Sequence, residues 1–340
     1  MVIIMAEEKN TIKSVMDIFT NDWNKQVILY GPPGTSKTYS STIIAAKMLG
    51  SGEKTNYKEY EDYLKTVKDR FKLVQFHPSY CYEDFVRGIK VKTEDGTPNY
   101  NVEAQIFEKF CDEAKNALET KNALGTKNAL GNNKDEYTYD KDNAYVIVID
   151  EINRAPLASV LGELIYALEY RGQRVLSSYE IEGKDGLVVP PNVYIIGTMN
   201  TADRSIGSID YAVRRRFAFI PVGSNGDIIK DSWGNEAVGK TAKKLYDAIT
   251  GEGGLFSGEL LADPDMDAED IKIGHTYFLG NKNDKDTNDY LKYRVQYQIV
   301  PIYLEYIKDG IIKKEGKEAL QKILIDDKFE GIFKDIIKTD

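Results

Sequence analysis

The segment GPPGTSKT, at positions 31–38, constrains the fold of this chain more than any other segment. It follows a short β-rich run, QVILYG, and precedes a run with helical patterning, YSSTIIAAKML. In a strand–loop–helix context, the backbone N–H groups of such a loop wrap around phosphates, and the positive end of the following helix favours their negative charge. The segment therefore predicts a phosphate-binding loop at the start of an α/β nucleotide-binding domain.

The residues of this loop have separate expected roles. Lys37 reaches the outer phosphates, and the Thr38 hydroxyl is a ligand of Mg²⁺. Ser36 stands where the usual pattern, G-x-x-x-x-G-K-[ST], has its second glycine. The Cβ of serine allows fewer backbone conformations than glycine has, but it leaves the roles of Lys37 and Thr38 unchanged. The predicted nucleotide-binding residues are Gly31, Pro32, Pro33, Gly34, Thr35, Ser36, Lys37 and Thr38.

Two carboxylates stand at the end of another apolar run. In VIVIDE, residues 146–151, four β-forming residues carry Asp150 and Glu151 to the end of a strand. We predict that Asp150 holds the Mg²⁺ shell and that Glu151 polarises the attacking water. Adjacent carboxylates can also simply begin a helix, but their pairing with an upstream phosphate loop favours the catalytic interpretation.

Another apolar run, VYIIGTMN, ends at Asn200. If this strand lies between the phosphate-loop strand and the Asp150 strand, Asn200 reaches the γ-phosphate and the attacking water. A polar side chain is then required at the tip of an otherwise apolar strand. Asp203 and Arg204 lie just beyond it and belong to the same predicted site.

The order of the apolar runs predicts the fold class. Runs at 26–31, 72–76, 144–150, 192–200 and 217–222 alternate with helix-patterned segments, which indicates a mostly parallel sheet sandwiched by helices. We expect this α/β domain to span residues 1–222, with a helix over 11–26 and a low-complexity insertion at about 112–143 that contains three KNAL copies.

A smaller, mostly helical domain is expected over residues 223–340. Apolar residues recur at helical spacing between Leu291 and Tyr306, and Pro301 should bend or interrupt that helix.

Three consecutive arginines, Arg214, Arg215 and Arg216, end the helix expected after Asp210. They could simply be solvated side chains whose positive charges interact favourably with the C-terminal end of the helix dipole. Alternatively, one is an arginine finger that reaches the nucleotide of a neighbouring subunit, which requires a ring of subunits. Arg215 or Arg216 is the expected finger, and Arg214 is the weaker candidate.

The charge and composition exclude several function classes. A net charge of −9 argues against a polyanion-binding surface, so any DNA contact must be local or delegated to a partner. Two cysteines predict no disulfide framework, and no apolar stretch approaches the ~20 residues that span a bilayer. We expect a cytoplasmic protein. The segment NKND, residues 281–284, matches a guanine-reading pattern but lies far downstream of the predicted sheet, so it is set aside.

Several segments carry a specific resemblance. The runs MNTADRS (199–205), IDEINRAPLASVLGEL (149–164), DYAVRRRF (210–217) and IGHTYF (273–278) resemble, in the same order, segments of the McrB-type AAA+ GTPases, the motor subunits of McrBC modification-dependent restriction systems. The resemblance covers about residues 26–307. It implies an AAA+ P-loop NTPase fold with a helical lid domain, and a preference for GTP, with ATP possible.

The same resemblance implies partners and further roles. Members form hexameric rings and are stimulated by an McrC-type nuclease subunit, with DNA handled indirectly or through a central pore. Asn200 would act as the sensor, and Asp203 and Arg204 would organise the hydrolytic site or the partner's contact with it. Only about thirty residues precede Gly31, so we expect this chain to lack the family's N-terminal DNA-recognition domain.

Two alternatives stay open. A MoxR-like AAA+ ATPase that remodels other proteins shares a similar DEINRA segment but is not expected to carry MNTADRS. A nucleotide switch without hydrolysis, which only scaffolds a partner, is disfavoured by the presence of Glu151, Asn200 and the arginines.

Overall fold

The computed structural model of the chain describes residues 6–94, 97–123, 138–184, 186–203, 209–281 and 287–336. The chain divides into two compact units. The first contains the residues up to Tyr30 together with Lys37–Pro221, and the second contains Gly31–Ser36 together with the residues from Val222 onward. By its contacts, most of the phosphate-loop segment therefore groups with the C-terminal part of the chain.

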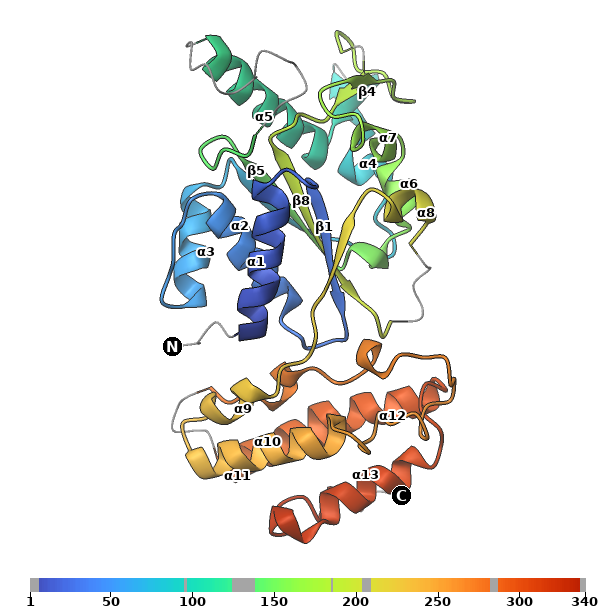
Figure 1. The fold of residues 1–340 in the computed structure, drawn as a ribbon. Helices are drawn as coiled ribbons and strands as arrows, with labels where there is room; N and C mark the ends of the chain where they lie inside the picture. The colour runs from blue at the N-terminus through green and yellow to red at the C-terminus, as the bar shows by residue number, and fades with distance from the viewer. Residues whose placement is uncertain are drawn as a thin grey trace. The chain divides into compact units, whose positions relative to one another are not determined.

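The first unit is built on a five-stranded sheet with strand order β2-β5-β8-β1-β9. The strands, shown in Figure 1, are β1 (Gln26–Gly31), β2 (Phe71–Gln75), β5 (Tyr145–Asp150), β8 (Val193–Asn200) and β9 (Ala218–Pro221). The pairs β1–β9, β2–β5 and β5–β8 are parallel. All five predicted runs are strands, and β8 lies between β5 and β1 as the Asn200 hypothesis requires.

Both faces of this sheet are covered by helices, as Figure 1 shows for α1 (Ala6–Thr20) and α2 (Lys37–Met48) on one side and α6 (Leu157–Leu161) and α7 (Leu164–Ala167) on the other. Alternate strand residues, such as Ile147 and Ile149, belong to one buried core with the second set of helices. This double coverage explains why the strands are apolar on both faces.

The helix predicted over residues 11–26 is wrong at its C-terminal end, because α1 ends at Thr20. Asp22 adopts a left-handed backbone conformation with φ of 57°. That conformation terminates an α-helix and lets the chain turn into β1.

Two antiparallel hairpins were not predicted from the sequence. The first pairs β3 (Arg87–Glu94) with β4 (Thr97–Ala104), and the second pairs β6 (Arg174–Val175) with β7 (Leu187–Val188). The strands of the second hairpin have only two residues each, too few to produce a recognisable alternation.

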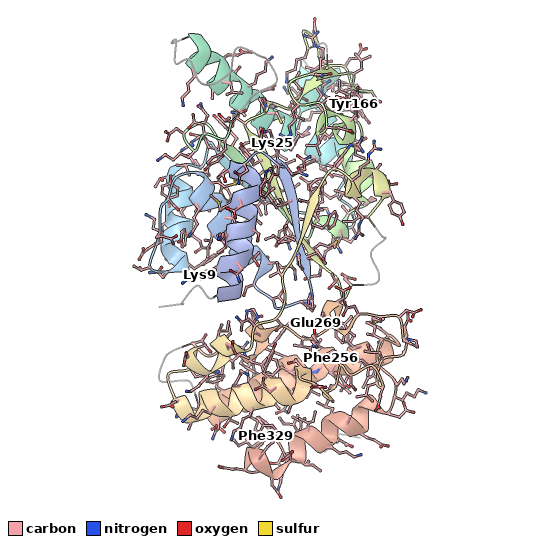
Figure 2. All side chains as sticks on the ribbon, viewed as in Figure 1. Lys9, Lys25, Tyr166, Phe256, Glu269 and Phe329 are labelled. Carbon is pink, nitrogen blue, oxygen red and sulfur yellow. The ribbon has the colours of Figure 1, made fainter. Side chains whose placement is uncertain are left out.

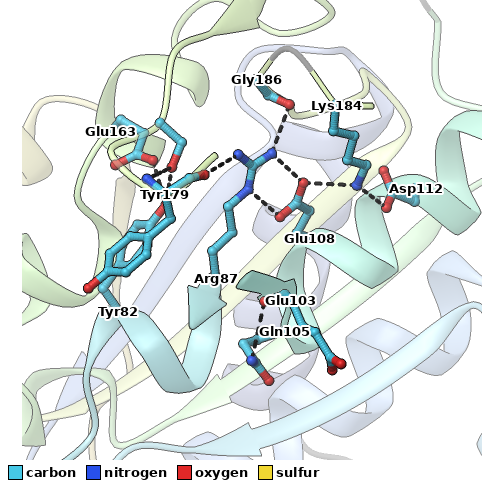
Figure 3. A network of polar contacts seen from close by, with 11 residues as sticks. Tyr82, Arg87, Glu103, Gln105, Glu108, Asp112, Glu163, Tyr179, Lys184 and Gly186 are labelled. Atoms are coloured by element: carbon cyan, nitrogen blue, oxygen red, sulfur yellow. Dashed lines mark hydrogen bonds and ion pairs between the residues drawn. The ribbon is translucent and has the colours of Figure 1, made fainter. Parts of the chain in front are cut away.

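A buried ion pair ties the first hairpin to α5 (Ile106–Ala123), as Figure 3 shows. The Arg87 guanidinium donates two hydrogen bonds of 2.6 Å to the Glu108 carboxylate, and the two residues are 1% and 2% exposed. Lys184, which precedes β7, also donates to Glu108 at 2.9 Å. Bidentate pairing of this kind fixes geometry, and removal of Glu108 would leave the buried Arg87 charge without its carboxylate partner.

The remaining short helices of the first unit connect these elements. They are α3 (Tyr57–Thr66), α4 (Tyr82–Phe85), the 3₁₀ turn η1 (Ile152–Arg154) and α8 (Tyr211–Arg214). The KNAL insertion begins inside α5, and its residues 124–137 lie outside the described part of the chain.

The second unit is mostly helical. Its longer elements are α9 (Asp227–Asp231), α10 (Glu236–Thr250), α11 (Asn288–Arg294), α12 (Val300–Lys308) and α13 (Gly316–Ile325), with short turns at η2 (Ala268–Asp270), η3 (His275–Phe278) and η5 (Asp327–Phe329). Phe256 and Phe329, labelled in Figure 2, are buried in its core.

The chain around Pro301 stays helical but does not form one regular α-helix, and Pro301 lies in the first turn of α12. A π-helical turn, η4 (Val295–Ile299), joins α11 to α12, and the Val300 N–H donates to the Val295 carbonyl. Such a turn re-pairs backbone groups near a residue that lacks an N–H. Among the described residues, no helix combines the length and apolar character that crossing a bilayer demands.

Candidate nucleotide-binding site

Asp150, at the end of β5, accepts hydrogen bonds from two hydroxyl groups of neighbouring elements. Thr38, at the start of α2, donates to Asp150 Oδ1 with an oxygen–oxygen distance of 2.8 Å. Thr198 on β8 donates to the same oxygen at 2.5 Å. The parallel pairing of β5 with β8 brings their carboxyl ends to one edge of the sheet, so residues 48 positions apart in sequence meet there.

Thr198 was missed by the sequence analysis. Its hydroxyl oxygen also accepts a 3.1 Å hydrogen bond from the Glu151 N–H, so it joins both residues of the acid pair to β8. The signal was its position two residues before Asn200, because alternate residues of a strand share a face. It was overlooked because it lies inside an apolar run.

Glu151 and Asn200 contact each other directly. The Asn200 side-chain amide donates to Glu151 Oε1 at 2.6 Å, and the other carboxylate oxygen lies 3.3 Å from Arg154 Nε. Glu151 has a φ of 54°, a left-handed conformation that is uncommon for residues other than glycine and often marks functional sites. The Asn200 carbonyl in turn accepts a hydrogen bond from the Asn153 amide at 3.1 Å.

Burial and several charged or polar neighbours set the pKa of Glu151. Burial is the largest cause and raises the pKa of this carboxyl above its ordinary value. Arg154, Lys37 and the Asn200 hydrogen bond act in the opposite direction, while the charge of Asp150 adds to the rise. A carboxylate with a raised pKa is a better proton acceptor than an ordinary surface glutamate.

Lys37 is 7% exposed at the start of α2. Burial lowers the pKa of its ammonium group to about 8, and the nearby charges of Glu151 and Asp150 partly oppose that fall. A bound polyphosphate would favour the charged form of this lysine further. Within the first unit, the side chains of Lys37, Asp150, Glu151 and Asn200 therefore form one interacting group.

The oxygen donors around Asp150 suit Mg²⁺. Hydroxyl and carboxylate oxygens are its preferred ligands, and Mg²⁺ in nucleotide enzymes usually takes one or two carboxylates together with substrate phosphates and water. In the described part of the chain, no three His, Cys, Asp or Glu residues cluster as a ready-made metal cage. Thr38 and Asp150, joined by a hydrogen bond, supply oxygen atoms of the kind that Mg²⁺ prefers.

The two polar residues beyond Asn200 are only partly described. Asp203 is half-buried, and Arg204 lies outside the described residues.

The three arginines at the C-terminal end of α8 have different surroundings. Arg216 is 8% exposed, and its guanidinium lies 2.6 Å from Glu169 Oε2 and donates to the Ala212 carbonyl at 2.5 Å. Arg215 is largely exposed and lies 3.6 Å from the same Glu169 oxygen. Arg214 is exposed and stacks on the ring of Phe219. Arg215 thus has more freedom to reach outward than Arg216.

In the second unit, the phosphate-loop segment Gly31–Ser36 has its own supports. The Pro33 and Gly34 carbonyls accept hydrogen bonds from the backbone N–H groups of Gly274 and Thr276, at 2.9 and 3.0 Å. Gly34 has a φ of 78°, which glycine adopts without strain.

Comparison with known proteins agrees with this arrangement. Residues 26–217 match the model of the AAA domain, dynein-related subfamily. The chain is 32% identical over 319 residues to the "Type IV methyl-directed restriction enzyme EcoKMcrB subunit" of Escherichia coli (strain K12), covering 90% of this chain and 59% of that protein. It is 26% identical over 215 residues to the "Type II restriction enzyme BsuMI component YdiS" of Bacillus subtilis (strain 168), covering 56% of this chain and 55% of that protein.

The chain thus spans somewhat more than half the length of these two relatives. The family match includes β1, β5 and β8 and every residue of the Thr38–Asp150 and Glu151–Asn200 contacts. We conclude that the chain belongs to the dynein-related subfamily of AAA domain proteins and is a McrB-like NTPase.

Proposed function

We propose that this chain hydrolyses GTP, with Mg²⁺, as the motor subunit of a McrBC-like restriction system. The observation that supports hydrolysis best is the 2.6 Å hydrogen bond between Asn200 and Glu151, next to the 2.8 Å hydrogen bond between Thr38 and Asp150. A chain that only bound nucleotide would need the phosphate loop and Asp150 but not an oriented carboxylate beside them.

In this proposal, residues Gly31–Thr38 bind the phosphates and the Lys37 ammonium neutralises their charge. Thr38 and Asp150 hold Mg²⁺, which when bound withdraws charge from the phosphate oxygens. Glu151 accepts a hydrogen bond from the attacking water and takes up its proton. Asn200 orients the carboxylate that does so, and its amide also senses the terminal phosphate. Asp203 and Arg204 organise the same site.

A complete site in this proposal needs a second subunit. The exposed Arg215 is the arginine finger, which stabilises the charge of the transferred phosphoryl group in a neighbouring subunit's site. Arg216, buried against Glu169, holds the end of α8 so that Arg215 projects outward. The chain therefore works as a homo-oligomeric ring, and a hexamer is the expected size.

The partner in this proposal is an McrC-type nuclease subunit, because the two relatives are described as a restriction enzyme subunit and a restriction enzyme component. With a net charge of −9, the chain has little surface for unaided DNA binding. DNA contact is therefore indirect or confined to a central pore. A cytoplasmic location agrees with this role.

The test is to measure GTP and ATP hydrolysis with and without the McrC-type partner, together with the particle mass in a non-hydrolysable analogue. We expect a partner-stimulated GTPase and a mass of several subunits. Faster turnover and tighter binding with ATP would favour a MoxR-like remodelling ATPase. Binding without any turnover, even with the partner present, would favour a scaffold.

A further inference from the structure

The segment Ile273–Phe278, with sequence IGHTYF, packs closely against the phosphate-loop segment Gly31–Ser36 inside the second unit. Besides the two backbone hydrogen bonds to Pro33 and Gly34, the His275 imidazole reaches the loop, with Nε2 3.1 Å from Ser36 Oγ. The sequence assigned no role to His275, and it marked Ser36 as a nucleotide-binding residue that departs from the usual glycine.

The neighbours of His275 fix the position of its proton. The Asn225 backbone N–H donates to His275 Nδ1 at 3.1 Å. A neutral imidazole carries one N–H, and since Nδ1 accepts, the hydrogen must be on Nε2. His275 therefore donates to the Ser36 hydroxyl, and the Asn225 backbone holds the ring in the tautomer that can do so.

Burial keeps this histidine neutral. His275 is 1% exposed, and burial lowers its pKa to about 4. Protonation would also set an Nδ1–H against the Asn225 N–H, since both would then be donors. The donor to Ser36 is therefore present throughout the neutral range of pH.

Ser36 has a backbone conformation that favours glycine. Its φ is 65°, in the left-handed region, where a Cβ costs free energy. Glycine, which the usual loop pattern has at this position, would adopt the same φ without that cost. The serine hydroxyl brings one contact that glycine lacks, the hydrogen bond from His275.

The histidine segment is itself rigidly held. A Cβ added to Gly274 would lie 2.0 Å from the Gly34 carbonyl oxygen, so only glycine fits there. Arg294, at the end of α11, donates to the Thr276 and Tyr277 carbonyls at 2.7 and 2.8 Å. His275 thus lies in a segment whose backbone is held in place by hydrogen bonds and close packing.

We propose that His275 is a positioning residue for nucleotide binding, which through its hydrogen bond to Ser36 holds the segment Gly31–Ser36 in its phosphate-binding conformation. The Ser36 hydroxyl accepts this hydrogen bond. At this position the loop thus gives up the conformational freedom of glycine and gains a specific contact with His275. The inference rests on the nucleotide-binding role of the loop and is independent of GTP preference, ring formation and any nuclease partner.

Two substitutions of His275 separate its two hydrogen bonds. The amide nitrogen of His275→Gln can stand in for Nε2–H and still donate to Ser36. The amide oxygen of His275→Asn can stand in for Nδ1 and accept from Asn225, but its side chain is too short to reach Ser36. We expect His275→Asn to raise the Kd for fluorescent GTP and ATP analogues about fivefold to tenfold, the effect of one lost hydrogen bond, and His275→Gln to stay within about twofold of the wild type.

Ser36→Gly tests the other end of the bond. If the serine only strains the loop, restoring glycine should leave nucleotide binding unchanged or tighter. The proposal instead predicts weaker binding, similar to that of His275→Asn, and no further loss in the double variant, because both substitutions remove one interaction. His77→Asn changes the exposed second histidine of the chain and serves as the control.

The melting temperature without nucleotide distinguishes positioning from general stability. Equal Kd values for His275→Asn and His275→Gln, tight binding by Ser36→Gly, or additive losses in the double variant would each overturn the proposal. So would a lower melting temperature for His275→Asn with an unchanged Kd. A wild-type chain that binds neither nucleotide would overturn the nucleotide site itself, whereas these outcomes in a nucleotide-binding wild type overturn only the role of His275.

Discussion

The side-chain amide of Asn200 donates a hydrogen bond to the carboxylate of Glu151, with Nδ2 and Oε1 2.6 Å apart. The two residues are 49 positions apart in the sequence and meet because β5 and β8 are neighbours in the sheet. The carboxylate is therefore oriented by the fold itself, before any substrate is bound. An oriented base whose charge acts on Lys37 within the same unit is the central feature of the proposed hydrolytic site.

Asn200→Ala removes this orientation and leaves the phosphate loop intact. Misplacement of a catalytic group by about 1 Å can cost ~100-fold in rate. We therefore expect turnover to fall about 100-fold, with the Kd for nucleotide within a few fold of the wild type, in steady-state hydrolysis and equilibrium binding assays. Asn99→Ala, at an exposed position of β4, is the control and should behave as the wild type. Undiminished turnover in Asn200→Ala would show that the hydrogen bond is not needed.

Thr198→Val removes a hydroxyl that serves both acidic residues. The substitution keeps the shape of the side chain but leaves the Glu151 N–H without its partner and Asp150 with one hydrogen bond fewer. We expect the free energy of unfolding to fall by ~1–3 kcal/mol, measured by denaturant titration. The Mg²⁺ concentration for half-maximal turnover should rise as well. Thr198→Ser retains the hydroxyl, and a loss as large in this variant would contradict the assignment.

The pKa of Lys37 predicts how nucleotide affinity depends on pH. In the free protein this pKa is about 8, and bound phosphates favour the charged ammonium and so raise it. Binding therefore takes up a proton once the pH exceeds about 8, and the Kd should weaken as the pH rises, by up to about tenfold per unit. Below pH 8, where Lys37 is already charged, its protonation should no longer change the Kd.

Lys37→Arg provides the comparison, because a guanidinium stays charged over this range. Titrations from pH 7 to about 9.5 should show a steeper loss of affinity in the wild type than in Lys37→Arg. Equal slopes for the two proteins would exclude Lys37 as the titrating group, since the titration of the nucleotide itself is common to both.

Substitutions of Arg215 and Arg216 should have different effects, one on turnover and the other on stability. Arg216→Ala breaks a buried contact with the half-exposed Glu169. We expect a loss of ~1–3 kcal/mol in the free energy of unfolding, less than for a pair buried on both sides. Arg215→Ala should leave stability unchanged and lower turnover about 1000-fold, the scale of a lost arginine finger.

A mixing experiment tests whether Arg215 acts on a neighbouring subunit. Arg215→Ala and Glu151→Gln subunits should each be nearly inactive alone. A mixed ring contains interfaces that combine an intact Glu151 from one subunit with an intact Arg215 from the next, so activity should return on mixing. No recovery in verified mixed rings would contradict a finger acting between subunits.

Much of the sheet could be predicted from the sequence. Its three central strands, β5, β8 and β1, are buried on both faces, and such strands are continuous apolar runs whose polar ends are easily seen. Asp150, Glu151 and Asn200 were identified for this reason. Thr198 belongs to the same strand end but is hidden among apolar neighbours.

The remaining features depend on contacts between residues far apart in sequence. Three consecutive arginines look alike until Glu169 is seen beside Arg216. The bond between Ser36 and His275 joins residues 239 positions apart. The Arg87–Glu108 pair is also invisible in sequence, because burial and not residue type distinguishes it from a surface ion pair.

The most direct test of the account is the hydrolysis rate of Glu151→Gln, measured with saturating nucleotide, Mg²⁺ and the McrC-type partner, alongside its Kd for nucleotide. Gln keeps the size of the side chain and loses only its ability to accept a proton, so we expect turnover to fall at least 100-fold while the Kd stays within a few fold of the wild type. Turnover close to that of the wild type in this variant would contradict the proposed hydrolytic site.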